Sequence, residues 1–283
     1  MKLIEKQYFP NERDLYGADG LLLRDCTFDG VEDGESALKE SKDIALENCY
    51  MNLRYPLWHD EKLSLDNVTM TENCRAALWY SKDIFIKNSN MLGIKALREC
   101  ADAAIANTKI VSPEFGWKSN GVTLNNCALT SEYAFLLARD LSFHKVDFKG
   151  KYSFQYVENA AFEDCTLDTK DAFWHTKNVT VRNCVVKGEY LGWYSENLTF
   201  ENCTIIGTQP LCYCKGLRLI DCKTELCDLA FEYSQVQADI RGDIVSVKNP
   251  LAGVISADTI GEIIYTKDSK HPCACRVEIR KTA

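Results

Sequence analysis

Hydrophobic and polar positions recur along this chain at intervals of about nineteen residues. The stretch NVTVRNCVVKG at 178–188 is followed at 197–207 by NLTFENCTIIG. Stepping by nineteen from Cys184 reaches small, mostly apolar residues over six successive intervals, and the series continues toward the N-terminus at intervals of 19, 21, 19 and 23. These anchors are Cys26, Cys49, Val68, Ser89, Thr108, Cys127, Val146, Cys165, Cys184, Cys203 and Cys222. A repeat of this length predicts stacked turns of one chain.

Within each copy the apolar residues alternate, change phase once and then alternate again. Around Cys184 they are Val179 and Val181 before the anchor and Val186 after it. Successive side chains of a β-strand point to opposite faces, so each half of the pattern predicts a strand with one inward face. The change of phase predicts a corner between the two strands.

The corner has a composition of its own. The residue before each anchor is Asn or Asp in every copy except the one with Lys145. Asn tolerates the left-handed backbone that a sharp bend requires, and its amide is able to bond to the equivalent residue of the next turn. A second turn column, six residues before the anchor, holds Asp43, Asp83, Asp102, Gly121, Asp140, Asn159, Asn178, Asn197 and Gly216.

A third short strand is predicted nine to thirteen residues before each anchor, in segments such as YPLWH, AALWY and DAFWH. Three strands and bends in 19 to 23 residues make one coil of a parallel β-solenoid. The fold class is therefore all-β, a single-stranded parallel β-helix of about 12 rungs forming a rod of roughly 55 Å. We assign residues 1–283 to one domain, with an N-terminal cap at 1–20, repeating rungs at 21–240, and irregular final rungs and a cap at 241–283.

Composition excludes several classes of protein. With 46% hydrophobic and 26% charged residues and no apolar run of membrane-spanning length, the chain does not read as a membrane protein. A net charge of −8 argues against a nucleic-acid binder. The N-terminus lacks the apolar core of a secretory signal, so we expect a cytoplasmic protein whose 14 cysteines are reduced.

Strings such as GESALKES, TKDAFWHTKNVTV, GEYLGWYSENLTFENCTI and SVKNP resemble the family called domain of unknown function 3737. The resemblance covers almost the whole chain. It implies a right-handed parallel β-helix of the pectate-lyase-like superfold, but no established reaction that can be carried over residue by residue. Fold alone does not assign function.

The best-known proteins of that superfold cleave acidic polysaccharides, so the resemblance implies a carbohydrate-binding or carbohydrate-processing face; an enzyme of this kind is a lyase or a glycosidase. We look for this carbohydrate-binding face on the third strand. All five tryptophans lie ten residues before an anchor, and a spacing of ~4.8 Å allows their rings to line a groove for sugars. The candidate substrate-binding residues are Trp58, His59, Trp79, Trp117, Trp174, His175, Trp193 and Tyr194.

A structural interpretation of the tryptophan column is favoured over the functional one. Large aromatic side chains are usually well buried, and adjacent columns of a strand cannot both point outward. We therefore expect the tryptophans in the core, which leaves the next column, nine residues before the anchor, on the surface. An exposed tryptophan row with a groove indicates sugar binding instead.

The candidate catalytic residues lie in that next column. Glu99 is predicted between Tyr80 and Lys118 of the adjacent turns, with Arg98 beside it, an arrangement that suits a general acid or base. A solvated charge pair across turns explains the same residues and is favoured. His59 and His175 are six rungs apart and cannot share one small site.

No metal site or cofactor is predicted. The aspartates in register fall in the turn columns, no calcium-loop pattern is present, and the anchor cysteines read as small core residues. The C-x-C pairs Cys212 with Cys214 and Cys273 with Cys275 depart from the usual zinc spacing. The expected partner is an oligosaccharide or polysaccharide, with oligomerisation left open. The alternative is a non-catalytic scaffold for protein association.

Overall fold

The computed structural model describes residues 1–30 and 34–280. Residues 31–33, in the range predicted for the rungs, and 281–283, in that of the C-terminal cap, lie outside the described part. The described chain is a parallel β-solenoid of about 14 turns, so the predicted fold class is confirmed. Its one helical segment is a single 3₁₀ turn, η1 (Glu72–Cys74), and no helix in the described ranges is long and apolar enough to cross a membrane.

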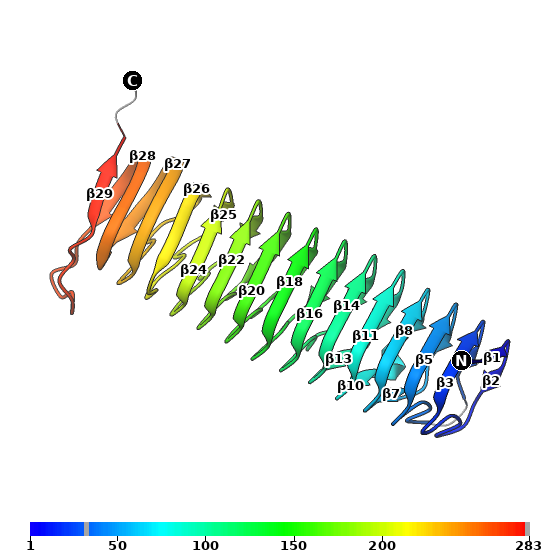
Figure 1. Cartoon of the computed structure of the whole chain (residues 1–283). Coiled ribbons are helices and arrows are strands. Elements are labelled where there is room, and N and C mark those ends of the chain that lie inside the picture. Colours follow the sequence, from blue (N-terminus) through cyan, green and yellow to red (C-terminus); the bar gives the residue numbers. More distant parts are fainter. Residues whose placement is uncertain (31–33, 281–283) are drawn as a thin grey trace. The chain divides into compact units, whose positions relative to one another are not determined.

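The chain divides into two compact units, residues 1–147 and 148–283. In the first unit, strands of successive turns pair in parallel (Figure 1). The longer strands are β1 (Lys2–Glu5), β3 (Asp19–Arg24), β5 (Lys42–Glu47), β8 (Glu61–Asp66), β11 (Lys82–Lys87), β14 (Ala101–Ala106), β16 (Asn120–Asn125) and β18 (Arg139–His144). The shorter ones are β2 (Tyr8–Phe9), β4 (Thr27–Phe28), β6 (Tyr50–Met51), β9 (Thr69–Met70), β12 (Asn90–Leu92), β15 (Lys109–Val111) and β17 (Ala128–Ser131).

The second unit continues the same two-strand pattern and then changes it. After β19 (Asp147–Lys151), which begins at the last residue of the first unit, paired strands follow as β20 (Glu158–Glu163), β21 (Thr166–Lys170), β22 (Lys177–Arg182), β23 (Val185–Lys187), β24 (Glu196–Glu201) and β25 (Thr204–Ile206). In the turns that follow, one long strand replaces the two strands and the corner between them. These long strands are β26 (Leu217–Glu225), β27 (Gln235–Lys248) and β28 (Ala252–Ile264), and they are followed by β29 (Arg276–Ile279). The turns outnumber the expected dozen because pairing begins inside the range assigned to the N-terminal cap and continues past residue 240.

The predicted inward columns form the core of each unit. Val179, Val181 and Val186 are fully buried, and the anchor Cys184 is 2% exposed. The anchor thiols are also hydrogen-bonded: Cys203 Sγ donates to the carbonyl oxygens of Val181 and Glu201, both at 3.3 Å. Free cysteine therefore acts here as a small buried side chain, as the anchor column predicted.

The asparagine corners are confirmed in both their predicted features. Asn183 and Asn202 adopt left-handed backbone, with φ of 54° and 50°. Asn202 Nδ2 donates to Asn183 Oδ1 at 2.9 Å, and Asn183 Nδ2 donates to Asp164 Oδ1 at 3.3 Å. The first unit repeats this ladder, for example from Asn126 to Asn107 at 2.8 Å. Each amide thus ties one turn to the next.

Replacing Asn183 or Asn202 by valine is expected to destabilise the protein by on the order of 1 to 3 kcal/mol. A β-branched residue is strained at positive φ, and the ladder bond is lost. Urea unfolding measures the change, with Thr180→Val on the outward side of β22 as the control that keeps the ladder. Unchanged stability in both corner variants contradicts the structural role of the corner.

The third side of the coil differs from the prediction. Only three turns of the described chain have a two-residue strand there, β7 (Leu57–Trp58), β10 (Leu78–Trp79) and β13 (Leu97–Arg98). Later turns replace it with consecutive bends in which left-handed residues alternate, as at Phe173 and His175, with φ of 62° and 55°. An extended strand over the whole column is therefore the part of the fold prediction that was wrong.

Candidate functional site

The tryptophans lie outside the coil, half-buried, so their expected place in the core was wrong. Before Trp58, Trp79 and Trp174 the core position is filled by the preceding residue, for example Leu57, which is fully buried. The reason is the backbone of the following residue: His59 has φ of 59°. A left-handed residue breaks the strand alternation, so that two adjacent columns both reach the surface.

The rings of these columns stack on one another in the second unit. Trp174 and Trp193 lie 5.4 Å apart between ring centroids with an interplanar angle of 5°. His175 is stacked between Tyr156 at 4.8 Å and Tyr194 at 5.0 Å. Tyr156 and Tyr194 remain 46% and 45% exposed. Because stacked rings cover each other's faces, this ladder presents mainly ring edges to solvent.

The candidate catalytic residues of the first unit lie in successive turns, as predicted from their spacing. Tyr80 N donates to the Arg98 carbonyl at 3.3 Å, and Glu99 N donates to the Trp117 carbonyl at 2.9 Å. The ion pair of Glu99 is with its neighbour Arg98, at 3.4 Å, while Lys118 lies exposed one turn further on. Their catalytic role stays a prediction.

Arg98 occupies the tryptophan column itself. Its guanidinium carbon lies 5.0 Å from the ring centroid of Trp79 and 4.9 Å from that of Trp117, which are cation–π distances. Arg98 Nη1 also pairs with Glu114 Oε2 at 3.4 Å. Arg98 therefore continues the tryptophan column as its cationic member. In the next column of the same unit, His59 is stacked on Tyr80 at 4.9 Å.

The indole N–H groups distinguish one tryptophan from the others. Four of them donate to a carbonyl of the following turn: Trp58 to Ala76 at 2.6 Å, Trp117 to Tyr133, Trp174 to Tyr190 at 2.6 Å and Trp193 to Gln209 at 2.8 Å. Trp79 Nε1 is buried and has no hydrogen-bond partner among the described residues. A buried donor without an acceptor is costly, by about 1 to 3 kcal/mol.

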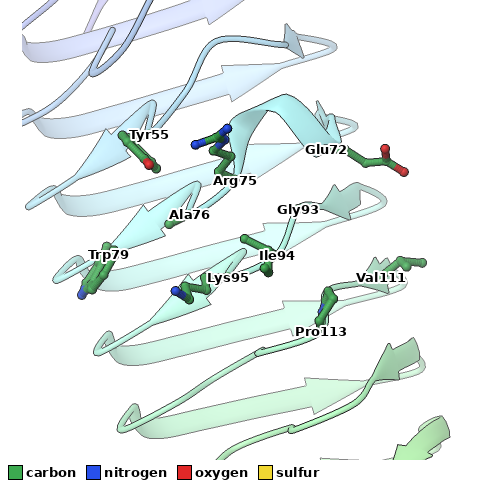
Figure 2. A pocket seen from close by; sticks show the side chains of 10 residues that line it. All are labelled: Tyr55, Glu72, Arg75, Ala76, Trp79, Gly93, Ile94, Lys95, Val111 and Pro113. Carbon is green, nitrogen blue, oxygen red and sulfur yellow. The ribbon is translucent and has the colours of Figure 1, made fainter. Parts of the chain in front are cut away.

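Trp79 lines a hollow of about 620 Å³ in the first unit (Figure 2). Trp79 lies at one end of the lining and Glu72 and Val111 at the other. The wall contains the left-handed Arg75, which ends η1 with φ of 54°. The lining residues are Tyr55, Glu72, Arg75, Ala76, Trp79, Gly93, Ile94, Lys95, Val111 and Pro113.

Glycine is required at position 93, where the backbone of one turn approaches that of Arg75 at the wall of the hollow. Its φ is 121°, and a Cβ there would lie 2.7 Å from the carbonyl oxygen of Arg75. The same carbonyl accepts the Lys95 N–H at 3.0 Å. The close approach of the two turns thus holds Arg75 and Lys95 at the edge of the hollow.

The charged residues that line the hollow are one carboxylate, Glu72, and two cations, Arg75 and Lys95. Lys95 Nζ lies 3.6 Å from Glu114 Oε2, so it is partly neutralised. The exposed Arg75 guanidinium makes no ion pair or side-chain hydrogen bond within the part of the chain that the structure describes. Ile94 and Val111 are exposed apolar residues of the lining. The hollow therefore combines a guanidinium without an ion pair and an apolar surface, and it is bordered by Trp79, whose buried N–H has no partner among the described residues.

Sequence reasoning singled out Trp79 only as one of five equivalent tryptophans and missed Arg75 altogether. Trp117, Trp174 and Trp193 donate to the residue sixteen positions further on. For Trp79 that position is Lys95, which lines the hollow instead. The interval of 21 between Val68 and Ser89, two residues longer than the usual nineteen, was the available signal of an irregular turn.

The C-x-C pairs are mostly inside the protein. Cys212 and Cys214 are 1% exposed, and burial raises the pKa of the Cys214 thiol to about 12. Cys275 is 9% exposed, while Cys273 is partly exposed in a surface segment. Within residues 1–30 and 34–280, no three His, Cys, Asp or Glu side chains gather in a way that could hold a metal ion.

Stacked parallel turns with buried anchor columns define the chain as a parallel β-solenoid. Over residues 2–278 it matches the model of a protein of unknown function, DUF3737, and it belongs to that family. No curated protein matches the chain.

Two solved structures show the distant structural likeness. One is the A-module of mannuronan C-5 epimerase AlgE4 from Azotobacter vinelandii, with 8% identity, a TM-score of 0.35, and coverage of 98% of this chain and 89% of that one. The other is the catalytic domain of a GH87 α-1,3-glucanase in complex with nigerose, with 12% identity, a TM-score of 0.28, and coverage of 99% and 63%. Likenesses of this degree assign no function to the chain.

Proposed function

We propose that the protein binds an acidic carbohydrate and that the Trp79 hollow receives one of its sugar rings. The observation that carries the proposal is the buried Trp79 Nε1 without an acceptor, where the other four indoles have one. A ligand oxygen in the hollow satisfies this donor. Binding then recovers the hydrogen bond that the protein alone lacks.

The rest of the lining favours a ring that carries a carboxylate. A guanidinium binds a carboxylate through two parallel N–H···O bonds, and Arg75 is free to do so. Ile94, Val111 and Pro113 supply an apolar surface for the C–H face of a sugar. A volume of about 620 Å³ lies within the range of small-molecule sites.

A panel of uronate and neutral oligosaccharides, titrated by calorimetry, tests the proposal. Uronates are expected to bind, and Trp79→Phe and Arg75→Gln are expected to weaken binding about tenfold or more, because each removes a hydrogen-bond donor to the ligand. Trp193→Phe is the matched control, since its N–H already donates to Gln209. Absence of uronate binding, or full affinity in Trp79→Phe, overturns the proposal.

A second candidate function is association with another protein along the aromatic ladder of the second unit. Its support is the row of stacked rings with exposed edges, including Tyr156 and Tyr194. Stacked faces suit sugars poorly, whereas exposed aromatic edges are common in protein interfaces. Acrylamide quenching of tryptophan fluorescence that is unaffected by every sugar favours this alternative.

A further inference from the structure

A second hollow, of about 580 Å³, lies in the second unit between the segments that precede β26 and β27, the two ends of β27 and the segment after β28. Tyr213, Glu232, Lys248, Leu251, Thr266 and His271 are among its lining residues. It shares no residue with the Trp79 hollow and is not one of the sites that the sequence predicted.

The polar centre of this hollow is a carboxylate held in place by three donors. Glu232 Oε1 lies 3.0 Å from Lys248 Nζ and accepts a bond of 3.5 Å from Asn249 Nδ2. Glu232 Oε2 accepts the Tyr213 hydroxyl at 3.4 Å. The Glu232 side chain is only 17% exposed. These bonds fix the carboxylate in one position before any ligand arrives.

A fully buried asparagine supports this arrangement from behind. Asn249 Nδ2 also donates to Thr266 Oγ1 at 2.9 Å, and Asn249 Oδ1 accepts the Thr266 N–H at 2.9 Å. The Asn249 side chain therefore links Glu232 to the segment after β28, which forms the rim of the hollow. Tyr213 keeps its proton, since burial, and then the charge of Glu232, raises its pKa to about 12.

The unused hydrogen-bonding capacity of the cluster indicates its ligand. A carboxylate accepts about four bonds, an ammonium donates three and a phenol oxygen accepts two. The contacts above leave Glu232 with one acceptor position, Lys248 with two donors and Tyr213 with its lone pairs. A hydroxyl group both donates and accepts, so two neighbouring hydroxyls match this set.

The charge balance favours a neutral ligand. Glu232 and Lys248 neutralise each other at the centre. Asp268 and Lys270, both exposed in the lining, carry opposite charges. Lys215 pairs with Glu196 at 3.5 Å and is 71% exposed, so it offers little fixed charge to an anion. Tyr233 and Leu251 add apolar lining beside the polar centre. Polar groups at one side and an apolar surface at the other match the two faces of a sugar ring.

We propose that this hollow is a second binding site, which takes the vicinal diol of a neutral sugar ring between Glu232, Lys248 and Tyr213. It lies in a different unit from the Trp79 hollow and does not depend on acidic-sugar binding there. The continuous row from Tyr194 to Tyr213, stacked at 4.7 Å, ends at this site. The sugar would therefore bind at the end of the aromatic ladder and not along its stacked faces.

Calorimetric titration of the full chain with methyl glycosides of glucose, galactose and mannose tests this site. At least one is expected to bind, with affinity reduced about tenfold or more by Glu232→Gln and by Tyr213→Phe, because each removes a bond involving the carboxylate. Glu262→Gln, on an exposed residue of β28, is the control and keeps full affinity. Trp79→Phe also keeps it, which separates this site from the acidic-sugar site.

Two results overturn the proposal: no methyl glycoside binds, or binding is equal in Glu232→Gln, Tyr213→Phe and the unmodified protein. Thermal unfolding of each variant checks that the fold is kept. If Glu232→Gln fails to fold, Tyr213→Phe decides alone, because it removes only a hydroxyl from a ring that keeps its stacking on Tyr194. Glucuronate binding that Trp79→Phe keeps and Glu232→Gln or Tyr213→Phe weakens, without binding of the neutral glycosides, assigns the second hollow to anions and also overturns the proposal.

Discussion

Replacing Asp60 by serine is expected to stabilise the protein at pH 8 to 9 by several kcal/mol. Asp60 is 1% exposed, its Oδ1 accepts the Ser41 N–H at 2.8 Å, and its Oδ2 has no hydrogen-bond partner in residues 1–30 and 34–280. The equivalent positions of the turns on either side are Ser41 and Ser81. A carboxyl group therefore lies in a column that is otherwise serine at this point.

The effect depends on pH because burial raises the pKa of Asp60 from 3.8 to about 8. Below about pH 4 both the folded and the unfolded chain hold this proton, and the contribution of Asp60 to stability is fully present. Between the two pKa values only the folded chain holds it, so stability falls by about 1.4 kcal/mol per pH unit as the pH rises. By pH 9 the accumulated loss is on the order of 5 kcal/mol.

Urea unfolding of the unmodified protein and of Asp60→Ser from pH 5 to 9 measures this loss. The two stability curves are expected to separate progressively with rising pH. Asp60→Asn, which keeps the shape and cannot ionise, is expected to follow the flatter curve. Asp83→Asn is the matched control on an exposed residue of β11 and keeps the original slope. Parallel curves for all four proteins contradict an ionisable buried Asp60.

The sequence predicted the two strands and the corner well because those features repeat in register. Val179, Val181 and Val186 alternate as a half-buried strand requires, and Asn183 marks the left-handed corner by its residue type. Every turn must satisfy the same backbone hydrogen bonds as its neighbour, so the same residue types return in each copy. The periodicity of the sequence therefore predicts the architecture, and no single turn has to be interpreted on its own.

The third side was not predictable in the same way, because its backbone departs from the residues' usual preferences. His175 and Tyr194 have φ of 55° and 59°, in a region that Asn and Gly favour and bulky residues rarely adopt. Stacking on the neighbouring turns and backbone bonds, such as His175 N to the Trp193 carbonyl at 2.9 Å, hold them there. Tertiary contacts determine this backbone conformation, and no local sequence pattern predicts it.

The candidate sites were predictable only in part, for a related reason. Trp79 was in the predicted column, but its missing acceptor depends on how one turn meets the next near Gly93. Tyr213 follows Tyr194 by nineteen residues and could have been added to the column from the sequence. Glu232 follows Tyr213 by the same interval, but Lys248 does not continue the series, because it lies at the end of the long strand β27, which departs from the nineteen-residue register.

The glycines that end the two repeated stretches, Gly188 and Gly207, are explained by the structure alone. Gly188 has φ of 155°, and a Cβ there would overlap the carbonyl oxygen of Thr169 in the preceding turn. Gly207 has φ of 131° and lies in the same way against the carbonyl oxygen of Gly188. The end of each stretch is thus a place where backbone approaches backbone too closely for any side chain.

Gly188→Ala is therefore expected to destabilise the protein by about 3 to 4 kcal/mol, since it adds backbone overlap to an unfavourable φ. Gly242→Ala is the matched control in the same unit: its φ is 86°, but a Cβ there meets no atom within 4 Å. We expect it to cost only about 1 kcal/mol, from φ strain alone. Urea unfolding of both variants separates the two causes. Equal losses would show that φ strain accounts for both glycines and that the turns can move apart to admit a methyl group.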